Sequence, residues 1–173
     1  MENALVQVYT GDGKGKTTAA VGLAVRALGN QFKVRFLQFF KSEISGEVKP
    51  LEKLGADVSI HNHQDKPSWT MNEIEEQQLI ADSKEGWQIF VDLIQSKTYD
   101  LIVLDEANHV LNRGYIDKEE VLEILEQAKN TEVVFTGRNA PDWLMERADL
   151  VTEMKMHKHP FQQKIGSRTG IEK

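Results

Sequence analysis

The chain has 173 residues, a formal net charge of −6 and no cysteine. This length suits one domain with a full hydrophobic core. The lack of cysteine excludes disulfides, thiolate metal sites and cysteine nucleophiles, and the acidic balance argues against nucleic-acid binding. The sequence does not open on a secretory signal, and no window approaches the roughly 18 apolar residues of a membrane span. We therefore expect a cytoplasmic protein that is not bound to a membrane.

The charge is unevenly distributed along the chain. From residue 155 to the end, five cations accompany one acid, Glu172, so this tail carries +4 and the remainder −10. The cations are Lys155, Lys158, Lys164, Arg168 and Lys173. We treat residues 1–173 as a single domain with a basic tail from about 155. Such a tail is either simply solvated or folds back over an anionic ligand.

The first half of the chain alternates between predicted strands and helices. An apolar run at 5–9 predicts a strand that leads into a glycine-rich loop, and the alanine- and leucine-rich stretch 16–29 predicts a helix that stops at a glycine. A second strand is predicted at 33–40. A loop with a possible short helix follows at 46–55, and a third strand at 56–62.

A long helix is predicted from Thr70, which forms a capping-box pattern with Glu73. Its apolar positions keep helical spacing, at Ile80, Trp87, Val91 and Ile94. The run "DLIVLDE" at 100–106 predicts a buried strand. Asp117 with Glu120 predicts the capped start of another helix, which continues to about residue 129.

The last predicted elements are a strand at 132–138, a short helix at 140–148 and a strand at 149–154. Strands that are apolar on both faces and alternate with helices predict an α/β fold, with a mostly parallel sheet and helices on both faces. Such sheets bind ligands where their strands end and the loops begin.

The loop "TGDGKGKTT" is one residue tighter than the common phosphate-binding pattern G-x-x-x-x-G-K-[ST]. That pattern requires a glycine at position 10, where the chain has Thr10, and Gly11 follows one place later. Gly11, Gly13 and Gly15 permit backbone angles that let consecutive N–H groups face one anion. The start of the following helix adds its partial positive charge. The loop predicts a phosphate site rather than an ordinary glycine-rich turn.

Side chains of the loop have expected roles in such a site. Lys16 is the expected phosphate lysine, Lys14 adds a second cation, and the Thr17 hydroxyl is the expected Mg²⁺ ligand.

Two further motifs end predicted strands at the same edge of the sheet. In "LIVLDE", Asp105 is expected in the Mg²⁺ shell, and Glu106 either ligates the metal or orients a nucleophile. Alone, this motif could equally be a structural strand end, but the glycine loop strengthens it. In "FTGR", Arg138 is expected to grip a phosphate in fork fashion, the alternative being a surface arginine.

The histidines are not predicted to be metal ligands. His61 and His63 fall on one side of a strand and are expected at the surface, since no further metal-binding residues accompany them. His157 and His159 are expected to make contacts of the basic tail rather than a metal clip. His109 is expected to be a hydrogen-bonded helix residue.

Taken in order, several stretches resemble the ATP:corrinoid adenosyltransferases, the cob(I)yrinic acid a,c-diamide adenosyltransferase group. They are "YTGDGKGKTTAAVGLAVRALG", "VRFLQFFK", "LIVLDE", "VVFTGR", "ADLVTEM" and "KHPF" followed by "GIE". The resemblance runs from about Val6 to Glu172, and the tight loop is its most specific element. It implies a P-loop NTPase-like (RecA-like) fold.

The resemblance also implies an activity. Members transfer the 5′-deoxyadenosyl group of ATP to the cobalt of a reduced, Co(I) corrinoid and release triphosphate, with the terminal phosphate deepest in the loop. It implies nucleotide binding by Gly11, Asp12, Gly13, Lys14, Gly15, Lys16, Thr17 and Thr18. It implies Mg²⁺ near Thr17, Glu106 and Asp105, and charge stabilisation by the catalytic cations Lys16, Lys14 and Arg138.

The corrinoid side of the site is implied by the same resemblance. Trp69 matches a tryptophan that displaces the lower axial ligand of cobalt, although the phenylalanine expected two residues earlier is Pro67 here. From the sequence alone, Trp69 either staples the start of the long helix or faces a ligand. The family implies a reduced flavoprotein as electron donor and a homodimer. Some members carry an N-terminal helix over the site, so here either the tail covers it or the corrinoid is more exposed.

The sequence is also compatible with two alternative functions. A P-loop kinase or ATPase would cleave the γ-phosphate, which the loop spacing disfavours. A non-catalytic protein would carry a corrinoid in a nucleotide-dependent way.

Overall fold

The structure is a computed structural model that describes residues 3–41, 45–61 and 70–171. Its strands are β1 (Val6–Thr10), β2 (Val34–Phe39), β3 (Asp57–His61), β4 (Leu101–Asp105), β5 (Glu132–Thr136) and β6 (Leu150–Glu153). Its helices are α1 (Lys16–Gly29), α2 (Val48–Lys53), α3 (Glu73–Ser96), α4 (Ala107–Asn112), α5 (Lys118–Gln127) and α6 (Asp142–Arg147), with a 3-10 helix, η2 (Pro160–Gln163).

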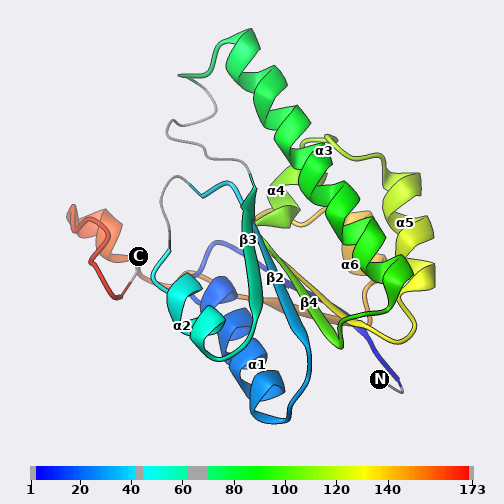
Figure 1. The fold of residues 1–173 in the computed structure, drawn as a ribbon. Coiled ribbons are helices and arrows are strands. Elements are labelled where there is room, and N and C mark those ends of the chain that lie inside the picture. Colours follow the sequence, from blue (N-terminus) through cyan, green and yellow to red (C-terminus); the bar gives the residue numbers. More distant parts are fainter. Residues whose placement is uncertain (1–2, 42–44, 62–69, 172–173) are drawn as a thin grey trace.

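The six strands form one sheet in the order β3-β2-β4-β5-β1-β6, and all neighbouring pairs are parallel (Figure 1). The carboxyl ends of the strands therefore meet at one edge of the sheet. Strand β5 lies between β1, which leads into the glycine loop, and β4, which ends in Asp105. This is the strand arrangement of RecA-like P-loop proteins, so the predicted fold is confirmed.

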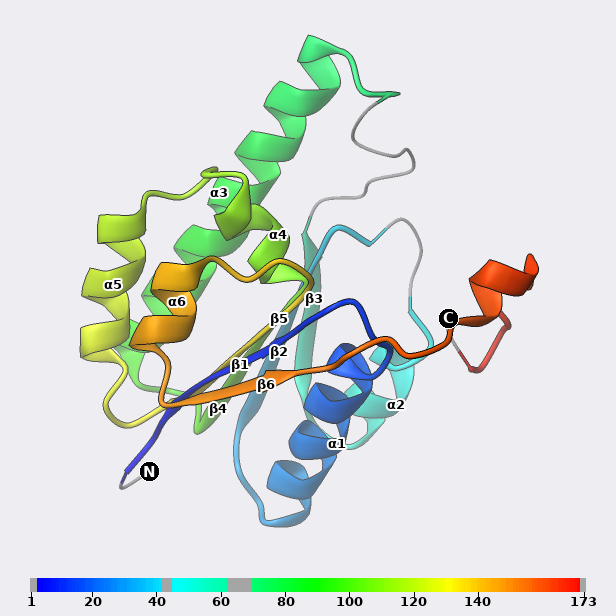
Figure 2. The same cartoon turned by 180° about the vertical axis from the view of Figure 1, so that it is seen from behind.

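Helices cover both faces of the sheet (Figures 1 and 2). Helices α1 and α2 lie on one face, and α3, α4, α5 and α6 on the other. On the first face, Ala20, Ala24 and Ala27 of α1 are buried and belong to one cluster with Phe36 and Val103 of the sheet. The small side chains at this helical spacing let α1 approach the strands closely.

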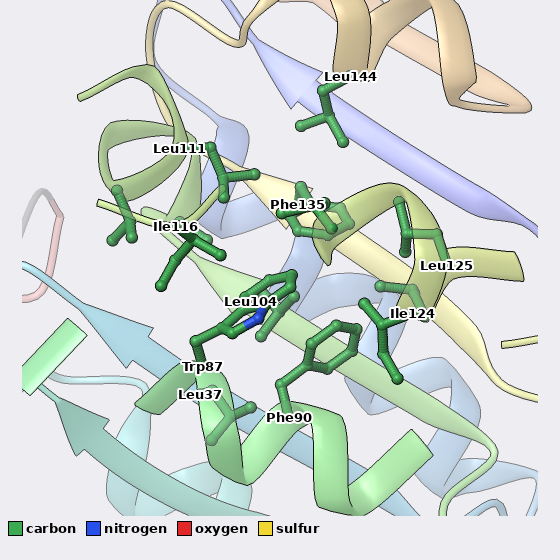
Figure 3. Packing of buried hydrophobic residues seen from close by; sticks show 14 of the residues in the cluster. Leu37, Trp87, Phe90, Leu104, Leu111, Ile116, Ile124, Leu125, Phe135 and Leu144 are labelled. Atoms are coloured by element: carbon green, nitrogen blue, oxygen red, sulfur yellow. The ribbon is translucent and has the colours of Figure 1, made fainter. Parts of the chain in front are cut away.

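The second face holds the larger core, shown in Figure 3. The rings of Trp87 and Phe90 of α3 pack at a tilt of 53° with centroids 5.0 Å apart, and Phe90 meets Phe135 of β5 edge to face at 6.3 Å. The indole N–H of Trp87 donates to Oε1 of Glu120 at 2.6 Å, which joins α3 to α5. The helical stripe predicted in α3 is confirmed at Trp87 and Ile94, which are buried, whereas Ile80 and Val91 are half-buried at its margin.

The predicted start of the long helix is wrong by two residues. Helix α3 begins after Asn72, whose side chain accepts from the N–H of Glu75, while the Glu75 carboxylate accepts from the N–H of Asn72, both at 3.0 Å. Thr70–Glu73 and Asn72–Glu75 have the same spacing, and asparagine is the stronger N-cap residue. For α5, Asp117 stands at the predicted N-cap position without a side-chain capping hydrogen bond.

Two further expectations are corrected near the sheet edges. All four residues of the edge strand β6 are exposed, so this strand is not apolar on two covered faces. His61, at the end of β3, is half-buried rather than at the surface, because Gly86 of α3 leaves space for its ring beside Phe39. His63 lies outside the described residues. In the described ranges, no helix combines the length and apolar character of a membrane span.

Replacing Phe90 by alanine tests the core. Because Phe90 has no exposed surface and packs against two aromatic rings, Phe90→Ala should lower the free energy of unfolding by about 3–5 kcal/mol. Urea unfolding followed by circular dichroism measures this. Ile74→Ala, at a position of α3 that is 78% exposed, is the control and should change stability by less than about 0.5 kcal/mol. A loss below about 1 kcal/mol for Phe90→Ala would contradict the packing described.

Candidate active site

The glycine loop connects β1 to α1 at the carboxyl edge of the sheet. Gly15 is the N-cap residue of α1, no side chain caps the helix, and no acidic residue lies in its first turn. The first N–H groups of a helix have no partner within the helix and carry its partial positive charge. An uncapped start of a 14-residue helix is therefore suited to an anion.

The loop glycines are required for two different reasons. Gly11 and Gly15 adopt left-handed backbone conformations, with φ of 97° and 125°. Gly13 does not, but a Cβ there would lie 2.5 Å from the carbonyl oxygen of Met154, just after β6. The N–H of Gly13 donates to that same oxygen at 2.6 Å. Gly13 thus provides close packing of the loop against residue 154, whereas the sequence prediction gave it conformational freedom.

Lys16 occupies the centre of the loop. Its side chain is buried, and Nζ donates to the carbonyl oxygens of Gly11 and Gly13, both at 2.7 Å. Burial lowers the pKa of Lys16, while Glu106 and Asp12 favour the charged form. The loop therefore folds around the ammonium group of Lys16.

The second loop lysine points elsewhere. Nζ of Lys14 donates to the carbonyl oxygen of Ile171, near the end of the chain, at 3.0 Å. Lys14 thus faces the basic tail, while Lys16 faces the interior of the loop. Asp12 and Thr18 are exposed at the loop and at the first turn of α1.

Asp105 has no exposed surface and is surrounded by donors. Its Oδ1 accepts from the hydroxyls of Thr17 (2.8 Å) and Thr136 (2.6 Å), and its Oδ2 accepts from Nε2 of Gln38 (3.2 Å) and lies 3.3 Å from Nζ of Lys41. Burial raises the pKa of Asp105, and Lys41 opposes that shift. Because the Thr17 proton points to Asp105, the lone pairs of its oxygen are left for a cation.

Glu106 faces the glycine loop from the end of β4. Its backbone is left-handed, with φ of 61°, and its N–H donates to Oγ1 of Thr136 at 3.0 Å. Oε2 lies 3.2 Å from Nε2 of His109 in α4. Although burial raises the pKa of Glu106, the hydrogen bond and charge of His109 and the lysines Lys41 and Lys16 outweigh it, so the pKa is lowered. The expectation for His109 is met.

Arg138 follows β5 through Gly137, whose N–H donates to the carbonyl oxygen of Tyr9 in β1. The Arg138 side chain is exposed, and its charge contributes to lowering the pKa of Lys16. Both cations therefore lie at the same edge, as the sequence predicts. Trp69 and Pro67 lie outside the described residues.

Sequence reasoning missed Lys41, which follows β2 by two residues. Besides its contact with Asp105, its Nζ lies 4.0 Å from Oε1 of Glu47. Burial lowers the pKa of Lys41, but Asp105, Glu106 and Glu47 outweigh it and the pKa is raised. The signal was present in the sequence: a lysine that closely follows an apolar strand of a parallel sheet lies at the ligand-binding edge.

Thr136 and Gln38 were also missed. Both are buried polar residues at or near the carboxyl ends of apolar strands, and both donate to Asp105. As for Lys41, the sequence feature that predicts a place in the site is a polar side chain at the carboxyl end of a parallel strand.

In this site a glycine loop encloses Lys16 at the uncapped start of a helix, and the next residue, Thr17, donates to the buried Asp105. This arrangement is typical of P-loop nucleotide-binding proteins. Comparison with known families narrows this class. The family model described as ATP:corrinoid adenosyltransferase BtuR/CobO/CobP matches residues 2–172. The chain belongs to this family, as the resemblance predicted, and is an enzyme of the corrinoid adenosyltransferase class.

Curated relatives carry the same description. A corrinoid adenosyltransferase of Pseudomonas aeruginosa is 35% identical, over 99% of this chain and 84% of that protein. A corrinoid adenosyltransferase of Sinorhizobium sp. is 36% identical, over 99% of this chain and 81% of that protein. A corrinoid adenosyltransferase of Escherichia coli is 32% identical, over 99% of this chain and 86% of that protein. Among solved structures, the flagellar accessory protein FlaH from Methanocaldococcus jannaschii shares the fold, with a TM-score of 0.58 over 88% of this chain and 71% of FlaH, at 12% identity.

Gly13→Ala tests the contact between the loop and residue 154. The added Cβ meets backbone atoms of Met154 at 2.5 and 2.8 Å, so the loop and the following segment must separate. We expect the affinity for MgATP, measured by calorimetry, to fall about tenfold or more. Gly22→Ala, in a part of α1 with no atom within 4 Å of the added Cβ, should keep the affinity and stabilise the fold by about 0.5–1 kcal/mol. Unchanged MgATP affinity in Gly13→Ala would show that the contact is not needed.

Proposed function

We propose that the enzyme transfers the 5′-deoxyadenosyl group of ATP to the cobalt of a Co(I) corrinoid and releases triphosphate, in the synthesis or salvage of adenosylcobalamin. The observation that carries this proposal is the chemistry of the site. Phosphate-binding groups converge on the loop, whereas Glu106, the acid that faces it, is hydrogen-bonded to His109 and has a lowered pKa. Because this carboxylate is already engaged by His109, it is poorly placed to take a proton from an attacking water molecule, which disfavours hydrolysis of the γ-phosphate.

The proposed step needs no base. The electron pair of Co(I) forms the cobalt–carbon bond at C5′, and the bond from C5′ to the phosphate oxygen breaks. The oxygen keeps the bonding pair as triphosphate leaves, and cobalt becomes formally Co(III). Catalysis is then a matter of aligning the two substrates and stabilising charge on the leaving group.

The residues of the loop would stabilise that charge. In this proposal Lys16 and the uncapped N–H groups of α1 bind the phosphates that lie deepest, and Arg138 approaches from the neighbouring strand end. Lys14 lies on the tail side of the loop and contributes from there. With the terminal phosphate deepest, the ribose C5′ is left facing outward to the corrinoid.

The residues present fit a Mg²⁺ ion. Thr17 and Glu106 offer hard oxygen ligands, and Asp105 orients the Thr17 hydroxyl. The side-chain oxygen of Gln38 is buried beside this pair and has no hydrogen-bond partner among the described residues, which suits a hydrated cation nearby. The described residues hold no cluster of three metal-binding side chains, and Mg²⁺ ordinarily completes its shell with phosphates and water. When bound, it would neutralise charge on the triphosphate.

Three further parts of the proposal rest on the family resemblance. Trp69 would contact the corrinoid and displace its lower axial ligand, which makes Co(II) easier to reduce. A reduced flavoprotein would supply the electron that converts Co(II) to Co(I). The enzyme would work as a homodimer.

A product assay tests the proposed reaction. The enzyme is incubated with MgATP and chemically reduced cobalamin, the phosphate products are separated by ion exchange, and the corrinoid spectrum is followed. We expect triphosphate and a light-sensitive alkylcobalamin in equal amounts. Lys16→Ala should lower the rate by about 100-fold or more, because it removes a preorganised charge at the leaving group. Lys33→Ala, an exposed lysine at the opposite edge of the sheet, should leave the rate unchanged.

The other products identify the alternatives. ADP with phosphate, or a phosphorylated acceptor, would mean a kinase or ATPase. Unchanged ATP together with a bound corrinoid would mean a carrier. Either result overturns the proposed reaction.

Trp69→Ala separates reduction from transfer. If Trp69 displaces the axial ligand, its loss should reduce the rate from Co(II) with a flavoprotein reductant by about tenfold or more, since less four-coordinate cobalt is formed. The rate from chemically prepared Co(I) should change little. Parallel kinetics from the two starting states measure this, and an equal loss in both would remove the proposed role.

A further inference from the structure

The turn that carries Arg138, residues 137–140, is held in place by residues of β1 and α4. It follows β5 and passes the carboxyl end of β1 before α6 begins (Figure 2). Gly137 and Asn139 both adopt left-handed backbone conformations in this turn, with φ of 129° and 52°. Such conformations are uncommon outside glycine and persist where the surrounding contacts impose them. The contacts of the turn therefore determine where Arg138 lies.

Thr10, the last residue of β1, makes one of these contacts. Its side chain is buried, and its Oγ1 accepts from the N–H of Ala140 at 3.1 Å. Its carbonyl oxygen accepts from the N–H of Met154 at 2.8 Å. Thr10 thus connects the start of the glycine loop to the segments that follow β5 and β6. The common phosphate-binding pattern has glycine at this position, and glycine has no hydroxyl with which to hold the turn.

Asn108 of α4 makes a second contact with the turn. It has no exposed surface, and its Nδ2 donates to the carbonyl oxygen of Gly137 at 2.9 Å and to that of Tyr9 at 3.4 Å. Its side-chain oxygen is buried and has no hydrogen-bond partner among the described residues, so the amide serves the turn as a donor. A Cβ added at Gly137 would lie 3.0 Å from Cβ of Asn108. The glycine therefore provides the space that Asn108 needs.

These contacts fix the backbone on both sides of Arg138. The residue before it is held through its N–H, which donates to the carbonyl oxygen of Tyr9 at 3.2 Å, and through its carbonyl oxygen, which accepts from Asn108. Two residues after it, Ala140 is held by Thr10. The Arg138 side chain is exposed, and a long exposed side chain has many rotamers. A fixed backbone reduces the positions that its guanidinium group can reach.

We propose that Thr10 and Asn108 are positioning residues for Arg138. They hold the turn so that the guanidinium group meets the phosphates bound at the glycine loop, and they do so without touching those phosphates. This rests on the proposed function, in which Arg138 stabilises charge on the triphosphate. It also gives a purpose to the threonine that replaces glycine in the tight loop, since Thr10 joins the loop to the arginine that complements it.

A double-mutant cycle on the binding of inorganic triphosphate tests this role. The affinity of the full chain is measured by calorimetry in the presence of MgCl₂. Arg138→Ala should weaken binding about tenfold, because it removes charged hydrogen-bond donors. Thr10→Val removes the hydroxyl but nearly keeps the shape of the side chain, and it should weaken binding about fivefold, as expected for residues of one network. When Arg138 is already alanine, Thr10→Val should have no further effect.

Two other substitutions of threonine are the controls. Thr131 is buried just before β5, at the other end of that strand, and its hydroxyl donates to the carbonyl oxygen of Tyr99 at 2.9 Å. Thr131→Val therefore also loses a buried hydroxyl contact, but away from the turn, and should leave triphosphate affinity unchanged. Thr10→Ser keeps the hydroxyl and should keep the affinity within about twofold of the wild type.

Asn108→Ala repeats the cycle from the other side of the turn. It should weaken triphosphate binding about fivefold when Arg138 is present and should have no effect when Arg138 is alanine. Circular dichroism establishes that each variant is folded. If Thr10→Val does not fold, the cycle with Asn108→Ala decides the proposal.

Three results would overturn the positioning role. The folded variants at residues 10 and 108 could bind triphosphate as tightly as Thr131→Val, they could lose the same affinity with and without Arg138, or Arg138→Ala itself could leave binding unchanged. These results leave the proposed reaction intact when the wild type still forms alkylcobalamin. Conversely, a wild type that shows the expected coupling but forms no alkylcobalamin would retain the positioning role and overturn the proposed reaction.

Discussion

A carboxyl group that is fully removed from water must have hydrogen-bond donors in place of its solvation, and this constraint organises the site. Asp105 meets it with contacts from four residues that belong to α1, to β5, and to β2 with the segment after it. Since each donor must reach the same two oxygens, the first turn of α1 and the ends of three strands are held in one arrangement. The same contacts position the glycine loop, because Thr17, which donates to Asp105, directly follows Lys16 of the loop.

The loop built on this base has two sides with different surroundings. On its inner side, Lys16 is enclosed by carbonyl oxygens of the loop and influenced by Glu106. On its outer side, Gly13 contacts Met154, just after β6, and Lys14 contacts Ile171 near the end of the described chain. The two lysines of the tight loop therefore lie in different surroundings, one inside the loop and one on the side of the tail. Side chains at Gly11, Gly13 or Gly15 are excluded, because an added Cβ at each would lie within 3 Å of an atom of Met154.

Local signals in the sequence predicted the elements well, and non-local contacts explain what was missed. Apolar runs, glycines and the spacing of "TGDGKGKTT" identify each strand and the loop from short windows. The partners of Asp105 do not follow from any window, because Thr17 lies 88 positions away and Gln38 lies 67 positions away. The sequence places Lys41 at the ligand-binding edge, but its contact with Asp105 depends on strand order, because β2 pairs with β4. The role of Gly13 likewise depends on the path of residue 154.

The conformation of Glu106 indicates which chemistry the site favours. A left-handed backbone at a residue other than glycine costs energy and persists only where its surroundings impose it. Here the N–H of Glu106 is held by Thr136, its carboxylate by His109, and Gly137 leaves room for that carboxylate, which would lie 3.3 Å from an added Cβ. These contacts keep the side chain charged and fixed toward the loop. A carboxylate that is fixed by His109 and Thr136 and faces the loop is suited to holding a cation there, rather than to moving between a water molecule and the phosphates.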